Sequence, residues 1–157
     1  MSFLPRSFDR TPTVTTRLQV LARDGRHCRF CGTPVISPTV RARFQKAYPR
    51  VVGWGTTNAS QHAAFQCMWL QYDHLLPNSR GGDSSAANVI VTCAVCNFGR
   101  MQATLAEAQL IDPLSHPTPE VWQGFKSWRG LESFEAASPF SDSDQLRPRS
   151  IDVGGAI

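Results

Sequence analysis

The spacing of apolar and polar residues predicts two helices in the first third of the chain. The first is expected over residues 11–24, since it opens on Thr-Pro, keeps its apolar residues on one face and closes at Asp-Gly. The second is expected over residues 37–48, opening on Ser-Pro and closing at Tyr-Pro. A loop follows over residues 53–58. Trp54 in this loop fits either a core position or stacking on a nucleic-acid base.

The middle of the chain has the pattern of two strands and a helix. Residues 65–72 are rich in aromatic and apolar side chains and predict a strand that ends at Asp-His. Turn-forming residues fill positions 77–85, and a β-branched strand is expected over residues 88–92. These two strands would form an antiparallel ribbon. A helix predicted over residues 95–110 would then pack on the ribbon, with Met101, Leu105 and Ala108 facing inward.

The alternation of elements predicts one α+β domain. It is expected to span residues 11–137, with a basic insertion at 33–64 and further helical turns within 118–137. Residues 1–10 have little periodicity and are expected to form an arm. From residue 138 the composition is rich in Ser, Asp, Pro and Gly, which is typical of a disordered tail.

The charge distribution favours a polyanionic partner. The net charge is +4, and residues 17–50 carry almost all of the basic excess, whereas residues 105–145 are acidic. Arginine, which forks onto phosphate oxygens, supplies most of the cations. Arg41, Arg43 and Lys46 are therefore predicted to contact nucleic acid. A merely solvated basic surface is the alternative for this segment alone.

The hydropathy of the chain offers no membrane-spanning segment. No apolar run approaches the ~18–20 residues that a spanning helix needs, and the first residues have no signal-peptide pattern. We therefore expect a cytoplasmic protein that does not bind membranes.

The cysteines predict a structural zinc site. Four of the five cysteines form two Cys-x-x-Cys pairs, Cys28/Cys31 and Cys93/Cys96, and this is the ligand set of a closed tetrahedral zinc site. Two disulfides are the alternative, which the expected reducing compartment disfavours. Cys67 lies in an apolar stretch and is expected to be a buried, inert thiol.

A second metal site is predicted where the first strand ends. Asp73 and the Asn97 carboxamide offer hard oxygens, which suit Mg²⁺, and a helix packed on the ribbon would bring Asn97 opposite Asp73. His74 beside this ion could accept a proton from water. These residue types together indicate a metal-dependent hydrolase of phosphodiesters.

The stretch from Asp73 to Asn97, with its flanking cysteine pairs, resembles the HNH endonucleases, whose core is a ββα-metal fold. The resemblance covers roughly residues 17–110. It implies that His74 is the general base and that Asn88 braces the loop through hydrogen bonds. The third motif position is Asn97 where many members have His, and this departure favours Mg²⁺ or Mn²⁺ as the catalytic ion.

The resulting prediction is a DNA endonuclease acting on double-stranded DNA. Arg100, one turn beyond Asn97, is expected to grip the scissile phosphate, and Arg80 is a second candidate. One active site cuts one strand, so double-strand cleavage would need a homodimer or two successive nicks. The alternative function is a zinc-stabilised nucleic-acid-binding module without catalysis.

Overall fold

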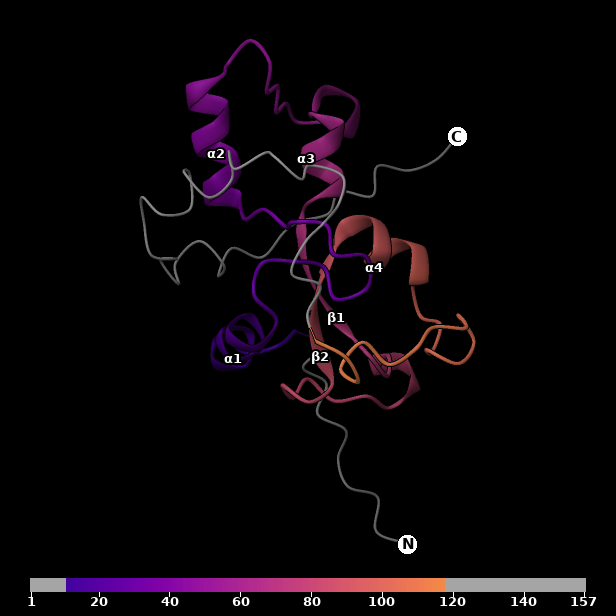
Figure 1. The fold of residues 1–157 in the computed structure, drawn as a ribbon. Helices are drawn as coiled ribbons and strands as arrows, with labels where there is room; N and C mark the ends of the chain where they lie inside the picture. Colours follow the sequence, from indigo (N-terminus) through magenta and orange to yellow (C-terminus); the bar gives the residue numbers. More distant parts are fainter. Residues whose placement is uncertain (1–10, 118–157) are drawn as a thin grey trace, which may run out of the picture.

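The computed structural model describes residues 11–117 (Figure 1). The expected arm at 1–10, the helical region at 118–137 and the tail from 138 lie outside the described residues. The helices and strands are α1 (Val14–Asp24), α2 (Pro38–Ala47), α3 (Ala63–Cys67), β1 (Leu70–His74), β2 (Val89–Cys93) and α4 (Ala94–Arg100), with short 3-10 turns at Asn58–Ser60 and Asn78–Arg80.

The centre of the fold is the predicted antiparallel ribbon. β1 pairs with β2 in a register that places Asp73 opposite Ile90 and His74 opposite Val89. Helix α4 starts at the residue after β2, so the ribbon and this helix form one continuous β-β-α unit. The structure therefore confirms the α+β class. Within residues 11–117, no helix has the length and apolar character that crossing a bilayer requires.

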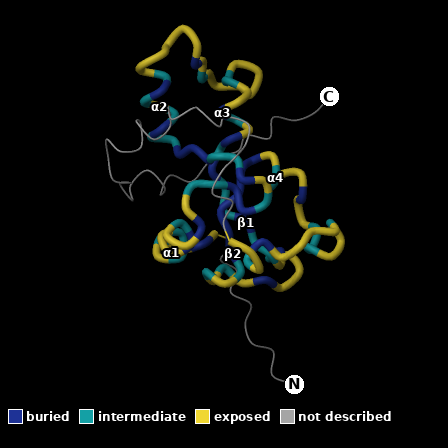
Figure 2. The backbone as a smooth tube through the Cα atoms, viewed as in Figure 1, coloured by how far each residue is buried: buried dark blue, intermediate teal, exposed yellow. Residues whose placement is uncertain are grey.

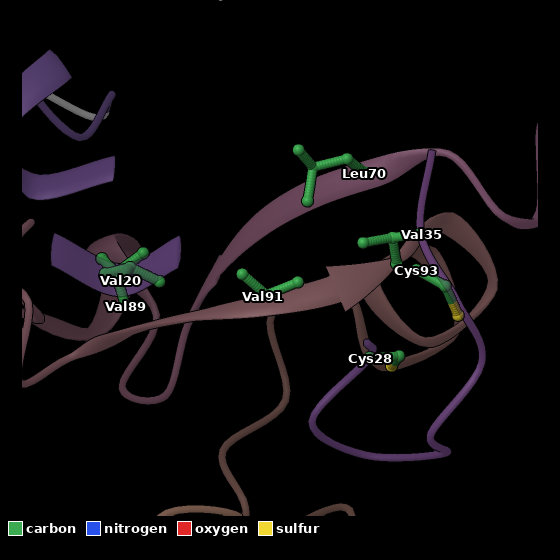
Figure 3. Packing of buried hydrophobic residues seen from close by; sticks show 7 residues of the cluster. All are labelled: Val20, Cys28, Val35, Leu70, Val89, Val91 and Cys93. Atoms are coloured by element: carbon green, nitrogen blue, oxygen red, sulfur yellow. The ribbon is translucent and has the colours of Figure 1, made fainter. Parts of the chain in front are cut away.

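One hydrophobic core joins α1, the cysteine pairs and the ribbon. Figure 3 shows Val20 of α1 near Val89 of β2, and Cys28 and Cys93 near the end of β2. The buried members of this cluster are Val20, Cys28, Val35, Leu70, Val89, Val91 and Cys93. Burial of these side chains holds the first helix against the strands that carry the Asp-His pair.

A second core belongs to residues 36–69, which we call the α2–α3 lobe. Its buried side chains are Ile36, Val40, Phe44, Val52, Phe65 and Met68. The lobe meets the ribbon at Ile36, whose carbonyl accepts a hydrogen bond from the backbone N–H of Leu70, the first residue of β1, at 3.0 Å. In Figure 1, α2 and α3 lie together at one end of the molecule, away from α1. Figure 2 shows the turn between them as largely exposed. Most of the expected basic insertion is thus a small packed unit.

The helix starts follow local capping chemistry. The Ser37 side chain accepts a hydrogen bond from the backbone N–H of Val40, and Pro38 begins α2, as predicted. Helix α1 instead starts two residues later than expected. The Thr13 hydroxyl, not that of Thr11, accepts from the backbone N–H of Thr16 at 3.1 Å. Gly25, at φ 67°, ends α1 where the sequence placed the end.

The first strand starts later than the sequence predicted, at Leu70 and not at Phe65. Residues 63–67 form the short helix α3, and β1 starts only at Leu70. The helix turns Phe65 into the core of the lobe while Ala63 and Ala64 stay exposed. Cys67 is also exposed, so the expectation of a buried thiol was wrong. Tertiary packing of one aromatic residue outweighs the β propensity of this segment.

The last described helix is much shorter than predicted. Helix α4 ends at Arg100, and Met101 follows with a positive φ of 51°. Met101 is 74 % exposed, which corrects its expected inward orientation. Beyond it the Thr104 and Glu107 side chains each accept a hydrogen bond from the other's backbone N–H, which stabilises a turn in place of a continued helix.

Candidate functional site

The four cysteines of the two pairs converge on one point. Their Sγ atoms all lie within 4.8 Å of one another, and Cys31 and Cys93 are 3.8 Å apart. Sulfurs around a tetrahedral zinc, with Zn–S bonds of about 2.3 Å, are separated by about 3.8 Å. All five cysteines are free, so the structure contains none of the disulfides of the alternative interpretation. The cluster could hold a structural zinc.

The thiols of the cluster share hydrogen bonds with one another. Hydrogen bonds from the Cys28 and Cys96 thiols lower the pKa of Cys93 to about 4. The Cys96 thiol donates within the same cluster, and these bonds to Cys28 and Cys93 raise its pKa. Zinc binds cysteine as thiolate, so an ion bound here would take the place of these shared protons.

Each cysteine pair is positioned by backbone hydrogen bonds. At the first, the N–H of Gly32 donates to the carbonyl of Cys28 at 2.8 Å, and Gly32 has a positive φ of 74° that favours glycine. At the second, Cys93 caps α4, with its Sγ accepting from the N–H of Cys96 at 3.5 Å. The N–H of Arg29 donates to the carbonyl of Val91, which ties the first pair to β2.

A buried carboxylate, Asp24, and the neighbouring exposed Arg23 fasten α1 to this unit. The Asp24 carboxylate is 1 % exposed and accepts from the N–H of Val91 at 2.9 Å and from the Arg23 guanidinium. Arg23 also donates to the carbonyl of Val89. Asp24 had been interpreted only as part of a helix end, because the sequence does not reveal which backbone N–H a carboxylate will meet.

Asp73 lies at the end of β1 in an ion pair with Arg100 of α4. Arg100 Nε donates to Asp73 Oδ2 at 3.0 Å, and Nη2 donates to Oδ1 at 2.6 Å. The remaining donors of Arg100 bind the backbone carbonyls of His74, Leu75 and Ala103. A guanidinium has five N–H donors, so each of them has an acceptor inside the protein.

This arrangement corrects the expectation that Arg100 grips a phosphate. The Arg100 side chain is 3 % exposed, and its hydrogen bonds connect α4 to the corner where β1 ends. Burial raises the pKa of Asp73, and the bonds from Arg100 oppose that rise by favouring the carboxylate. Arg100 therefore holds the Asp-His corner in place.

We predict that Arg100→Leu lowers the free energy of unfolding by about 3–5 kcal/mol, because it leaves the Asp73 carboxylate buried without a partner. Urea unfolding measures this as a lower midpoint. Arg80→Leu is the matched control. Arg80 pairs with Glu107 at 3.2 Å, but both side chains are about half exposed, so its loss should cost about 0–1 kcal/mol. Equal losses for both variants would contradict a structural role for the Asp73 pair.

His74 is the next residue and is half-buried. Its Nε2 lies 3.0 Å from the hydroxyl of Ser84. Burial lowers the pKa of His74, and the nearby Asp73 carboxylate opposes this shift. A lowered pKa favours the neutral imidazole, which is the form that can accept a proton.

Asn88 spans the loop between the two strands. Its Oδ1 accepts from the N–H of Leu76 at 2.8 Å, and its Nδ2 donates to the carbonyls of Leu76 and Asp83. A Cβ at Gly82 would lie 1.8 Å from the carbonyl oxygen of Leu76, so only glycine fits there. Asn88 thus ties the two sides of this loop together.

Asn97 lies in α4, directly after Cys96 and one turn before Arg100. Residues three apart on a helix share a face, and Arg100 is bonded to Asp73. The half-buried Asn97 thus lies on the same side of α4 as Arg100. Both oxygens of Asp73 accept from Arg100, but a carboxylate offers about four lone-pair sites. The donor set of one carboxylate and one amide fits a hard divalent cation.

The predicted nucleic-acid contacts differ in their surroundings. Arg41 stacks over the Trp54 ring at 4.8 Å and donates to Gln45, and burial lowers its pKa. Trp54 in turn stacks on Trp69 at 5.1 Å, as part of the lobe's packing, which favours the core interpretation of Trp54.

Other basic residues near α2 have greater access to solvent. Lys46 and Arg50 are exposed, and Arg43 is half-buried. Arg80, although paired with Glu107, keeps 54 % of its side chain exposed. Phosphate therefore has readier access to Lys46, Arg50 and Arg80 than to Arg41 or Arg100.

Comparison with family models and with curated proteins yields no match to this chain.

Proposed function

We propose that this protein is an HNH-type endonuclease that hydrolyses phosphodiester bonds in DNA with a divalent cation. The observation that carries the proposal is the position of Asp73 and His74 at the end of β1, where Arg100 of α4 binds Asp73 and Asn97 precedes Arg100 by one turn of the same helix. Phosphodiester hydrolysis needs a general base that activates water and a cation that stabilises charge on the phosphate. A histidine next to two oxygen ligands would supply both.

Each residue has a separate task in this proposal. Asp73 and Asn97 would hold Mg²⁺ or Mn²⁺, which when bound supplies positive charge to the scissile phosphate. His74 accepts a proton from the attacking water. Asn88 keeps the loop closed around His74, and Arg100 fixes the corner that carries both Asp73 and His74.

A plasmid-nicking assay tests the proposal. Purified protein should relax supercoiled DNA in Mg²⁺ or Mn²⁺ and stop when EDTA is added. Asp73→Asn keeps a hydrogen-bonding oxygen for Arg100 but loses the anionic ligand, so its activity should fall and should recover partly at higher cation concentration. Cleavage that persists in EDTA would contradict the proposal.

The alternative, a nucleic-acid-binding module without catalysis, is favoured by a specific observation. Asp73 is already neutralised by Arg100, so the pair as a whole attracts a dication less than a lone carboxylate would. This function predicts DNA binding that is insensitive to Mg²⁺ and an absence of nicking by protein that retains its zinc.

Under either function we expect the exposed cations of the α2–α3 lobe to contribute to DNA affinity. Replacing Lys46 and Arg50 together by alanine should reduce the slope of log K against log salt by about two, roughly one for each lost phosphate contact. The charge-preserving variant Lys46→Arg/Arg50→Lys should keep the wild-type slope. If both variants bind like the wild type, the lobe does not face the DNA.

A further inference from the structure

The hydroxyl of Ser84 lies 3.0 Å from Nε2 of the His74 ring, within hydrogen-bonding distance. Ser84 lies ten residues after His74, so the loop must close for the two to meet. Loop closure is fixed by Asn88, which donates to the carbonyl of Asp83 at 2.7 Å. The carbonyl of Ser85 also accepts from the N–H groups of Asn88 and Val89, so both neighbours of Ser84 are held to the start of β2.

The placement of Ser84 is further restricted by its neighbours' side chains. Asp83 Oδ1 accepts from the N–H of Ser85 at 3.1 Å and from its hydroxyl at 2.7 Å. Gly82, just before them, packs so closely on Leu76 that no side chain fits. The loop therefore has a defined shape on both sides of Ser84, and the approach of its hydroxyl to His74 is built into that shape.

The contact between Ser84 and Nε2 affects which ring nitrogen of His74 can accept a proton. A neutral imidazole has one nitrogen that donates and one that accepts, and a serine hydroxyl can serve either. We propose that Ser84 is a positioning residue that accepts a hydrogen bond from Nε2–H of His74 and so leaves Nδ1 as the atom that takes the proton. This inference rests on the proposed function, since it assigns the proton-accepting atom of the same base.

The hydrolysis step can be written with every proton and bond accounted for. A water proton moves to Nδ1 while the water oxygen forms a bond to phosphorus. The bond from phosphorus to the departing 3′-oxygen breaks, and that oxygen takes a proton from solvent water. Nε2–H stays in place and its bond to Ser84 strengthens when the ring becomes cationic. Ser84 thus holds the ring at the stage when its charge changes.

The inference is tested first by nitrogen-15 NMR of the His74 ring in the neutral form, which does not depend on any activity. Wild-type protein should carry the proton on Nε2, with a signal protected from exchange with water. Ser84→Ala should lose that protection, Ser84→Thr should restore it, and Ser79→Ala, an exposed serine of the same loop, should leave it unchanged. A ring protonated on Nδ1, or protection that persists in Ser84→Ala, would overturn the inference.

A second arm follows cleavage under single-turnover conditions. Ser84→Ala should slow the cleavage step about 2- to 12-fold, the equivalent of one hydrogen bond of ordinary strength, with DNA affinity unchanged. Ser84→Thr should recover most of the rate. An unchanged rate in Ser84→Ala would overturn the positioning role. Wild-type protein that cuts no DNA would overturn the proposed function instead, while the NMR result would still decide which nitrogen Ser84 engages.

Discussion

Cys93→Ser should abolish zinc binding and unfold most of the domain. Cys93 ends β2, caps α4 and contributes to the main core, so its sulfur connects three parts of the fold. Structural zinc supplies about 10–16 kcal/mol in small zinc domains, and whole domains are stable by only about 5–15 kcal/mol. Loss of the ion therefore exceeds what the two small cores can offset. Circular dichroism and elemental analysis of purified protein measure both effects.

Cys67→Ser provides the matched control for this experiment. Cys67 is exposed and lies outside the cluster, so the variant should keep its zinc and its melting temperature. Adding a strong chelator to the wild type should reproduce the unfolding seen in Cys93→Ser. Wild-type protein that is folded without zinc, or that has its cysteines oxidised to disulfides, would refute the site.

The second large effect is expected at His74. His74→Ala should lower cleavage by ~10²–10⁴, the usual contribution of a positioned general base. Folding, zinc content and DNA binding should be unchanged, because the side chain is half-buried and is neither a zinc ligand nor a member of either core. His116→Ala, which removes an exposed imidazole, should cut DNA at the wild-type rate.

The pH dependence gives His74 a signature of its own. Burial lowers its pKa below the ordinary value of about 6.5, so the neutral base is populated at lower pH than for a free imidazole. The cleavage rate should therefore rise with pH through a midpoint below about 6.5 and then level off. His74→Ala should lose this rise, and added imidazole should restore part of the rate. A midpoint well above 6.5 would contradict the assignment.

Local sequence signals predicted the elements that depend on neighbouring residues. Ser37-Pro38 and Gly25 marked helix ends that the structure contains, since caps and positive-φ glycines act within a few residues. The two Cys-x-x-Cys pairs predicted that the four thiols would lie together, because this spacing is typical of a zinc site. The ribbon also lies where strand and turn composition placed it.

The errors occurred where distant contacts decide the structure. Residues 63–67 form a helix because Phe65 fits the core of the lobe, which strand propensity alone could not indicate. An arginine at position 100 is of the type that binds phosphate. Its side chain turns inward because it forms an ion pair with Asp73. The contact between Ser84 and His74 requires a closed loop, and the sequence shows only that the segment favours turns.

The central claim, that the Asp-His corner hydrolyses DNA, is tested most directly by comparing two proteins in one nicking assay. Wild type and His74→Ala, each purified with its zinc content measured, are incubated with supercoiled plasmid in Mg²⁺ and in Mn²⁺. We predict nicked plasmid from the wild type and ~10²–10⁴-fold slower nicking from His74→Ala. Equal nicking by both proteins, or intact plasmid with the zinc-loaded wild type in both metals, would contradict it.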